Sequence, residues 1–169
     1  MQPLKPRRDI YIAVIGVGEE DPIAIELAHE VGRLIGARGA ILLCGGLGGA
    51  MNAAAKGAKE TDGVVIGILP GRERAGASSY LDYSIPTGLG EARNAVIVAA
   101  ADGLIAIGAG FGTLSEIGFA LKGGKPLVGL QTWRLFRGKE KVDAFPEFSS
   151  PLDAVEAIFK VIAEGYRRP

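Results

Sequence analysis

The chain has 169 residues, with 48% apolar residues, 22% charged residues and 26 glycines. This composition excludes a disordered chain and favours a single α/β domain over residues 1–169, with many tight turns and a flexible tail at 1–9. The formal net charge is zero, which argues against nucleic acid and anionic membranes as partners.

The first half of the chain alternates between strand and helix patterns. Residues 10–16 are a continuous apolar run that ends in glycine, which is typical of a buried parallel strand. A helix begins at Pro22, with Asp21 as its expected N-cap, and Gly39 ends it. Three further segments follow: a strand and turn over 40–46, a helix over 48–63, and a strand and turn over 64–71.

The second half continues this alternation. A loop over 72–90 carries a short strand near 83–85. The later elements are a helix over 91–102, a strand over 103–110, a helix over 112–124, a strand over 125–130, a loop over 131–149 that covers one sheet edge, and a last helix that Ser150 caps and Pro151 begins. The β-α-β series predicts a Rossmann-like, doubly wound, mostly parallel sheet with helices on both faces.

Two glycine-rich turns follow the first two strands, at the sheet edge where parallel sheets bind ligands. In the first, Gly16 and Gly18 lack the third glycine of a dinucleotide fingerprint, and two acidic residues follow them, so we expect no dinucleotide site. Gly16 remains a candidate ligand contact. The second turn either binds an anion through backbone N–H groups or permits tight strand-to-helix packing. Its candidate residues are Gly45, Gly46, Gly48 and Gly49.

The third turn, over residues 108–116, reads GAGFGTLSE and is the strongest candidate for a phosphate site. Its glycines permit backbone geometry that other residues avoid, and Thr113 offers a hydroxyl and an N–H to a phosphate. Glu116 either caps the helix in a capping box with Thr113 or lies in the site as a reacting carboxylate. The candidate binding residues here are Gly108, Gly110, Gly112 and Thr113.

Arg93 and Asn94 are polar residues in the first turn of an otherwise apolar helix. A buried arginine needs an anionic partner. Because both helices begin at the carboxyl edge of the sheet, Arg93 and Glu116 can face one cavity. Arg93 then binds a phosphate, or it forms an ion pair with Glu116 that serves only the structure.

Other residues limit the chemistry. The single cysteine, Cys44, excludes an internal disulfide, argues against a metal site and favours the cytoplasm. The longest apolar run, 95–101, has about seven residues, whereas a membrane-spanning helix needs roughly twenty. His29 is expected at the surface. Asn and Gln occupy only four positions, which is typical of thermophilic proteins.

These motifs resemble the LOG-like group of the Rossmann-type SLOG superfamily, which contains the LONELY GUY phosphoribohydrolases and the molybdenum cofactor carrier proteins. The resemblance runs roughly from residue 10 to residue 163. The group's PGGxGTxxE signature keeps its GTxxE part here, whereas Gly108 and Ala109 replace Pro and Gly, and Asn94 replaces the lysine of an Arg-Lys pair. The segments GLGEARN, CGGLGGAM and GILPG are more similar to the carrier branch.

The resemblance implies two chemistries. In the hydrolases, an N-glycosidic bond of a nucleoside 5′-monophosphate is cleaved, with Glu116 as the matching catalytic carboxylate and Arg93 orienting the phosphate. In the carrier branch, the same turns hold a phosphorylated pterin without turnover. Since Ala109 and Asn94 depart from the hydrolase pattern, our first hypothesis is binding of a nucleoside monophosphate or a molybdopterin-type cofactor. The alternatives are the hydrolase and a nucleotide-sensing domain.

The resemblance also bears on cofactors and assembly. Members of the group were once described as lysine decarboxylases, but that reaction needs a pyridoxal-phosphate lysine, and no lysine here has a suitable pocket context. We expect no required cofactor beyond a bound nucleoside monophosphate, phosphate or molybdopterin. The resemblance implies a homodimer or homotetramer, with the apolar helix at 95–101 as a contact.

Overall fold

The computed structural model describes residues 9–18 and 21–165. The predicted flexible tail, except for Asp9, and the two acidic residues of the first turn lie outside these ranges. Within them, seven strands form one sheet in the order β4-β3-β2-β1-β5-β6-β9, and every neighbouring pair is parallel. The strands are β1 (Tyr11–Gly16), β2 (Ile41–Cys44), β3 (Val64–Leu69), β4 (Tyr83–Pro86), β5 (Gly103–Ile107), β6 (Leu127–Leu130) and β9 (Glu147–Phe148).

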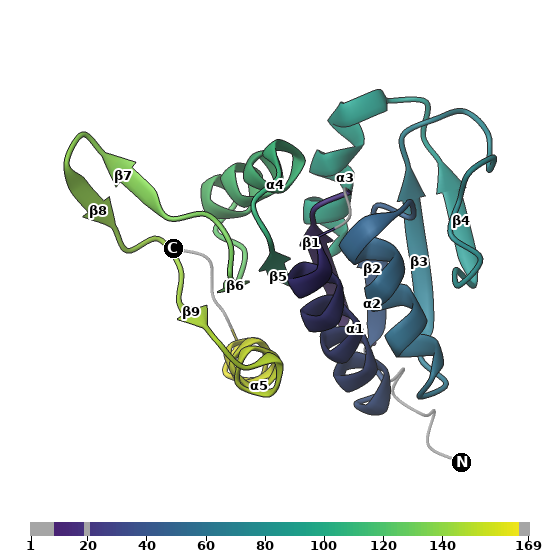
Figure 1. Ribbon diagram of the computed structural model, residues 1–169, viewed down its shortest axis with the longest axis horizontal. Coiled ribbons are helices and arrows are strands. Elements are labelled where there is room, and N and C mark those ends of the chain that lie inside the picture. Colours follow the sequence, from purple (N-terminus) through teal and green to yellow (C-terminus); the bar gives the residue numbers. More distant parts are fainter. Residues whose placement is uncertain (1–8, 19–20, 166–169) are drawn as a thin grey trace, which may run out of the picture.

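Five α-helices in the described ranges pack on this sheet, and a short 3-10 turn, η1 (Gly90–Ala92), leads into the third (Figure 1). They are α1 (Pro22–Ala37), α2 (Gly49–Lys59), α3 (Arg93–Ala100), α4 (Phe111–Lys122) and α5 (Pro151–Ala163). None of the described helices is long and apolar enough to cross a membrane.

The strands of the sheet face two hydrophobic cores, because successive strand residues point to opposite sides. Ile12 and Val14 of β1 pack with buried residues of α1, α2 and α5. Ala13 and Ile15 pack on the other face with residues of α3 and α4. Strand order reverses at β1, which pairs with β2 on one side and β5 on the other. The predicted doubly wound sheet is confirmed.

The expected N-caps of the first and last helices are confirmed. Asp21 accepts hydrogen bonds from the N–H groups of Ile23 and Ala24, and Ser150 accepts one from Asp153. A side-chain oxygen at this position satisfies N–H groups that have no partner within the helix.

The segment over residues 131–149 differs from the loop expected there. It contains an antiparallel hairpin of β7 (Leu135–Arg137) and β8 (Glu140–Val142), which projects from the sheet at the left of Figure 1. It also supplies β9, which pairs with β6 and forms the sheet edge. Strands of two or three residues carry too short an apolar alternation to be recognised in the sequence.

Candidate functional site

The turn after β5 lies beside the point where strand order reverses. Gly108 has a φ of 76°, and a Cβ there would lie 3.0 Å from Cγ1 of Val17, so any other residue would be strained at this position. Gly110 is the N-cap of α4 and provides no side-chain cap. The first N–H groups of α4, at Phe111, Gly112 and Thr113, therefore have no acceptor within the helix or from a capping side chain. Such N–H groups and the helix dipole favour an anion.

Thr113 lies in the first turn of α4 and is buried, with 2% of its surface exposed. Its hydroxyl oxygen has no hydrogen-bond partner among the described residues. Burying a hydroxyl without a partner costs about 1–3 kcal/mol. A ligand oxygen bound at the start of α4 would supply the missing partner, so the side chain fits a phosphate at this turn.

Glu116 is the sixth residue of α4 and is therefore too far along the helix to form a capping box, so the capping interpretation is wrong. Its side chain is buried, with 6% exposed. Burial raises the pKa of Glu116 to about 8, while the positive charge of Arg93 opposes this rise and Glu91 adds to it. The carboxyl group is consequently protonated and neutral at pH 7.

Arg93 begins α3 and is buried, with 6% exposed. Its Nη1 donates to the backbone oxygen of Gly45 at 2.6 Å and to that of Ile68. Its Nε donates to Oδ1 of Asn94 at 3.0 Å. Among the described residues no ion pair joins Arg93 to Glu116, which was one of the two alternatives left open by the sequence; the carbonyl oxygens of Gly45 and Ile68 accept from Arg93 instead. Carbonyl dipoles orient the guanidinium but leave its positive charge uncompensated.

Asn94 connects α3 to the first turn of α4. Its Oδ1 accepts from Arg93, and its Nδ2 donates to Oγ of Ser115 at 3.0 Å. The Ser115 hydroxyl in turn donates to the backbone oxygen of Gly112 at 2.7 Å. Asn94 therefore positions Arg93 relative to the candidate phosphate turn, and both the oxygen and the nitrogen of its side-chain amide are hydrogen-bonded.

Two of the candidate glycines serve close packing. A Cβ on Gly16 would lie 2.8 Å from Cβ of Ala50, and a Cβ on Gly49 would lie 2.3 Å from the carbonyl oxygen of Val17. Both positions bring the end of β1 against the start of α2. The packing alternative stated for the second turn therefore has a direct physical reason at Gly49, and the same reason applies to Gly16.

The other three glycines of the second turn have different surroundings. The backbone oxygen of Gly45 accepts from Arg93, and a Cβ there would lie 3.0 Å from both Nη1 and Nη2 of Arg93. Gly46 is packed against Leu69, whose Cδ2 would lie 2.7 Å from an added Cβ. Gly48 is exposed and is the N-cap of α2, with no side-chain cap. Gly48 is therefore the residue of this turn that is open to a ligand.

The segment that follows β6 contributes residues that the sequence analysis missed. Thr132 Oγ1 donates to the backbone oxygen of Gly108 at 2.6 Å, and Trp133 Nε1 donates to that of Gly110 at 3.0 Å. Gln131 has a φ of 46°, which non-glycine residues rarely adopt. The one available signal was a tryptophan three residues after the end of a buried strand, at the same sheet edge.

Two other chemistries find no site here. Burial raises the pKa of the Cys44 thiol to about 11, so the thiol stays protonated and is a poor nucleophile. Within the described residues, no group of three or more His, Cys, Asp and Glu side chains is placed to hold a metal ion.

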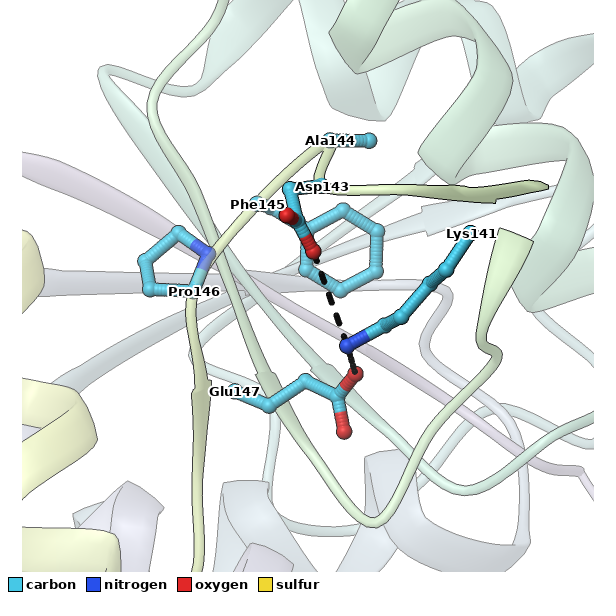
Figure 2. A pocket seen from close by; sticks show the side chains of 6 residues that line it. All are labelled: Lys141, Asp143, Ala144, Phe145, Pro146 and Glu147. Atoms are coloured by element: carbon cyan, nitrogen blue, oxygen red, sulfur yellow. Dashed lines mark ion pairs between the residues drawn. The ribbon is translucent and has the colours of Figure 1, made fainter. Parts of the chain in front are cut away.

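A cavity of about 560 Å³ lies beside the β7–β8 hairpin, and none of its lining residues belongs to these turns (Figure 2). Lys141 points into it between Asp143 and Glu147, at 3.6 and 3.7 Å. The lysine charge is already matched by these two carboxylates, so the cavity offers no free charge for an anionic ligand.

A parallel sheet that reverses its order beside glycine-rich turns defines a Rossmann-type α/β protein. The model of the SLOG cluster4 family matches residues 9–156, and the chain belongs to this family. The resemblance inferred from the sequence motifs is therefore confirmed.

Relatives of known sequence or structure agree with this assignment. An uncharacterised protein from Archaeoglobus fulgidus is 48% identical over 122 residues, which cover 72% of this chain and 80% of the relative. The molybdenum cofactor binding protein from Rippkaea orientalis is 39% identical with a TM-score of 0.85, covering 92% of this chain and 98% of that one. The molybdenum cofactor carrier protein from Chlamydomonas reinhardtii is 33% identical with a TM-score of 0.79, covering 92% and 99%.

Proposed function

We propose that the chain binds a phosphorylated small molecule, a nucleoside monophosphate or a molybdopterin-type cofactor, at the start of α4. The observation that carries this proposal is the hydroxyl of Thr113, which is buried without a partner beside unbonded helix N–H groups. A phosphate oxygen satisfies the hydroxyl and the N–H groups together.

The charges around the turn support an anionic ligand. Arg93 keeps a buried positive charge that backbone oxygens orient but do not neutralise. Glu116 is neutral at pH 7, because burial raises its pKa to about 8. With Glu116 neutral, Arg93 is the buried charge beside this turn, and hydrogen bonds from charged donors to phosphate are the stronger ones.

The similar proteins favour a molybdopterin-type ligand over a simple nucleotide. Two of them are described as a molybdenum cofactor binding protein and a molybdenum cofactor carrier protein. In this chain, Thr113 and the first N–H groups of α4 would hold the phosphate of such a ligand, and Arg93 would contribute positive charge from α3. Binding without chemical change is the role that we infer.

A second candidate function is hydrolysis of the N-glycosidic bond in nucleoside monophosphates. The observation that favours it is Glu116, a buried carboxyl group whose pKa of about 8 suits proton transfer near neutral pH. Asn94 argues against it, because its amide is occupied with Arg93 and Ser115.

Calorimetric titration with AMP and with neopterin monophosphate tests binding, and chromatography of the same mixtures tests for free adenine and ribose 5-phosphate. We expect binding of at least one of these ligands and no release. Release that disappears in Glu116→Ala would establish the hydrolase instead. Absence of binding to both ligands would contradict both candidate functions and the nucleotide-sensing alternative.

We also propose that the chain forms a homo-oligomer through α3 and α4. Val96 of α3 and Phe119 of α4 are exposed apolar residues on neighbouring helices, with 37% and 44% exposed. Light scattering coupled to size exclusion should give the mass of a dimer or tetramer. Val96→Asp should lower that mass, since it places a charge in the apolar contact. A monomeric wild-type protein would contradict this proposal.

A further inference from the structure

A solvent-exposed aromatic side chain lies beside the candidate phosphate turn. Phe111 is the first residue of α4, and 82% of its surface is exposed. No other large apolar residue in the described part of the chain is as exposed. Single apolar residues at a surface are common. This ring differs from other exposed apolar side chains in two ways. It lies next to the N–H groups at the start of α4, and it packs against a second aromatic ring.

Trp133 supports the Phe111 ring from the turn after β6. The two ring centroids are 5.7 Å apart at an interplanar angle of 38°, within the range of favourable aromatic pairs. The indole N–H donates to the oxygen of Gly110, which fixes the orientation of the tryptophan. Thr132 ties the same segment to Gly108. Two side-chain hydrogen bonds thus hold an aromatic pair against the turn.

We infer that Phe111, supported by Trp133, is the platform on which the planar ring of the ligand stacks; this inference rests on the proposed function. A phosphate at the start of α4 places the rest of the ligand near the first residue of the helix. A planar conjugated heterocycle, such as a nucleobase or a pterin, gains from stacking on an exposed aromatic face. A sugar phosphate has no such ring and gains nothing there.

The test compares three probes on one set of variants by calorimetry: AMP, neopterin monophosphate and ribose 5-phosphate. Phe111→Ala should weaken binding of the ring-bearing ligands about tenfold, the scale of one lost base–aromatic stack. It should leave the affinity for ribose 5-phosphate unchanged. Phe111→Trp should restore the loss, because it retains an aromatic face.

Phe136→Ala is the matched control, because Phe136 of β7 is also a strongly exposed phenylalanine, with 61% of its surface exposed. It lies on the β7–β8 hairpin and belongs neither to the candidate phosphate turn nor to the proposed oligomer contact. This variant should bind all three probes like the wild type. Trp133 is the only tryptophan in the chain, so its fluorescence should be quenched by the ring-bearing ligands and not by ribose 5-phosphate.

If Phe111→Ala binds AMP and neopterin monophosphate with the same affinities as the wild type, the platform is overturned. This holds even if the variant has a different oligomeric mass. A parallel loss of ribose 5-phosphate binding would also overturn it. Thr113→Val separates this inference from the proposed function: if that variant loses all three probes while Phe111→Ala loses none, the phosphate site stands and the platform is wrong. If the wild type binds none of the three, both fail.

Discussion

Thr113 and Arg93 are buried polar residues that lack the partners such groups normally have. The Thr113 hydroxyl has no acceptor or donor among the described residues, and Arg93 is held by carbonyl oxygens rather than by a carboxylate. Each arrangement costs free energy of folding, since buried polar groups are normally hydrogen-bonded and buried charges paired. A phosphate ligand would give the Thr113 hydroxyl a hydrogen-bond partner and the Arg93 guanidinium an opposite charge. We therefore assign both residues to the same phosphate site.

Thr113→Val tests this interpretation at a single atom. Valine keeps the shape but removes the unpartnered hydroxyl, so the ligand-free protein should gain about 1 kcal/mol in the free energy of unfolding. Affinity for AMP should fall about tenfold, because a hydrogen bond to a charged oxygen is lost. Urea unfolding and calorimetry measure the two effects. Thr113→Ser, which keeps the hydroxyl, should retain the wild-type affinity; loss of AMP binding in it would contradict the assigned role.

The affinity for AMP should also depend on pH. Burial raises the pKa of Glu116 to about 8, with Arg93 opposing and Glu91 assisting. Above that value Glu116 becomes negative and repels the phosphate, so binding should weaken between pH 7 and pH 9. Glu116→Gln stays neutral and should bind equally at both pH values. A wild-type affinity that is constant over this range would show that Glu116 does not face the phosphate.

At the scale of elements, α1 and α2 approach each other closely through glycines. A Cβ on Gly32 would lie 1.9 Å from the backbone oxygen of Ala54, and a Cβ on Gly57 would lie 2.0 Å from that of His29. This contact fixes α2, and with it the exposed Gly48 that caps its start, relative to α1. The position of Gly48 at the candidate site thus depends on contacts between α1 and α2 that lie outside the glycine-rich turns.

Gly32→Ala should destabilise the protein by about 1–3 kcal/mol, since backbone must move to admit the methyl group. Gly118→Ala is the matched variant in α4, where no atom lies within 4 Å of an added Cβ. It should stabilise the fold by about 0.5–1 kcal/mol, because glycine weakens helix interiors. Urea unfolding measures both. Equal effects of the two substitutions would contradict the close packing of α1 and α2.

At the scale of the whole molecule, Glu116 should make stability depend on pH. Its pKa rises from the ordinary 4.5 to about 8 on folding, so between these values the unfolded chain is ionised while the folded one is protonated. Because the folded state holds a proton that the unfolded chain has released, the free energy of unfolding decreases as pH rises from 4.5 to 8, by at most about 5 kcal/mol. The free energy of unfolding should fall between pH 5 and pH 8 in the wild type.

Glu116→Gln provides the control for this measurement, because its side chain does not titrate. The carboxyl groups of Glu30, Glu60 and Asp82 have lowered pKa values and stabilise the fold above their ordinary range, so they are already ionised at pH 5. The difference between wild type and Glu116→Gln over pH 5–8 thus isolates Glu116. Parallel pH profiles of the two proteins would contradict its raised pKa.

The doubly wound parallel sheet and the starts of α1 and α5 followed from the sequence, because apolar runs, capping residues and glycine turns are local signals. The nearness of α3 and α4 could be anticipated, since helices of a parallel sheet begin at one edge. The carbonyl partners of Arg93 could not, because backbone acceptors leave no mark on residue type. Trp133 and β9 were missed since their positions depend on tertiary contacts of a segment with little periodicity.

A crystal structure of the protein grown with AMP or neopterin monophosphate tests the central claim most directly. Phosphate oxygens should lie within about 3.2 Å of the Thr113 hydroxyl and of the first N–H groups of α4. The phosphate should also lie on the side of the turn that faces Arg93. A phosphate bound elsewhere, for example in the cavity of Lys141, with the Thr113 hydroxyl still unpartnered, would contradict the claim.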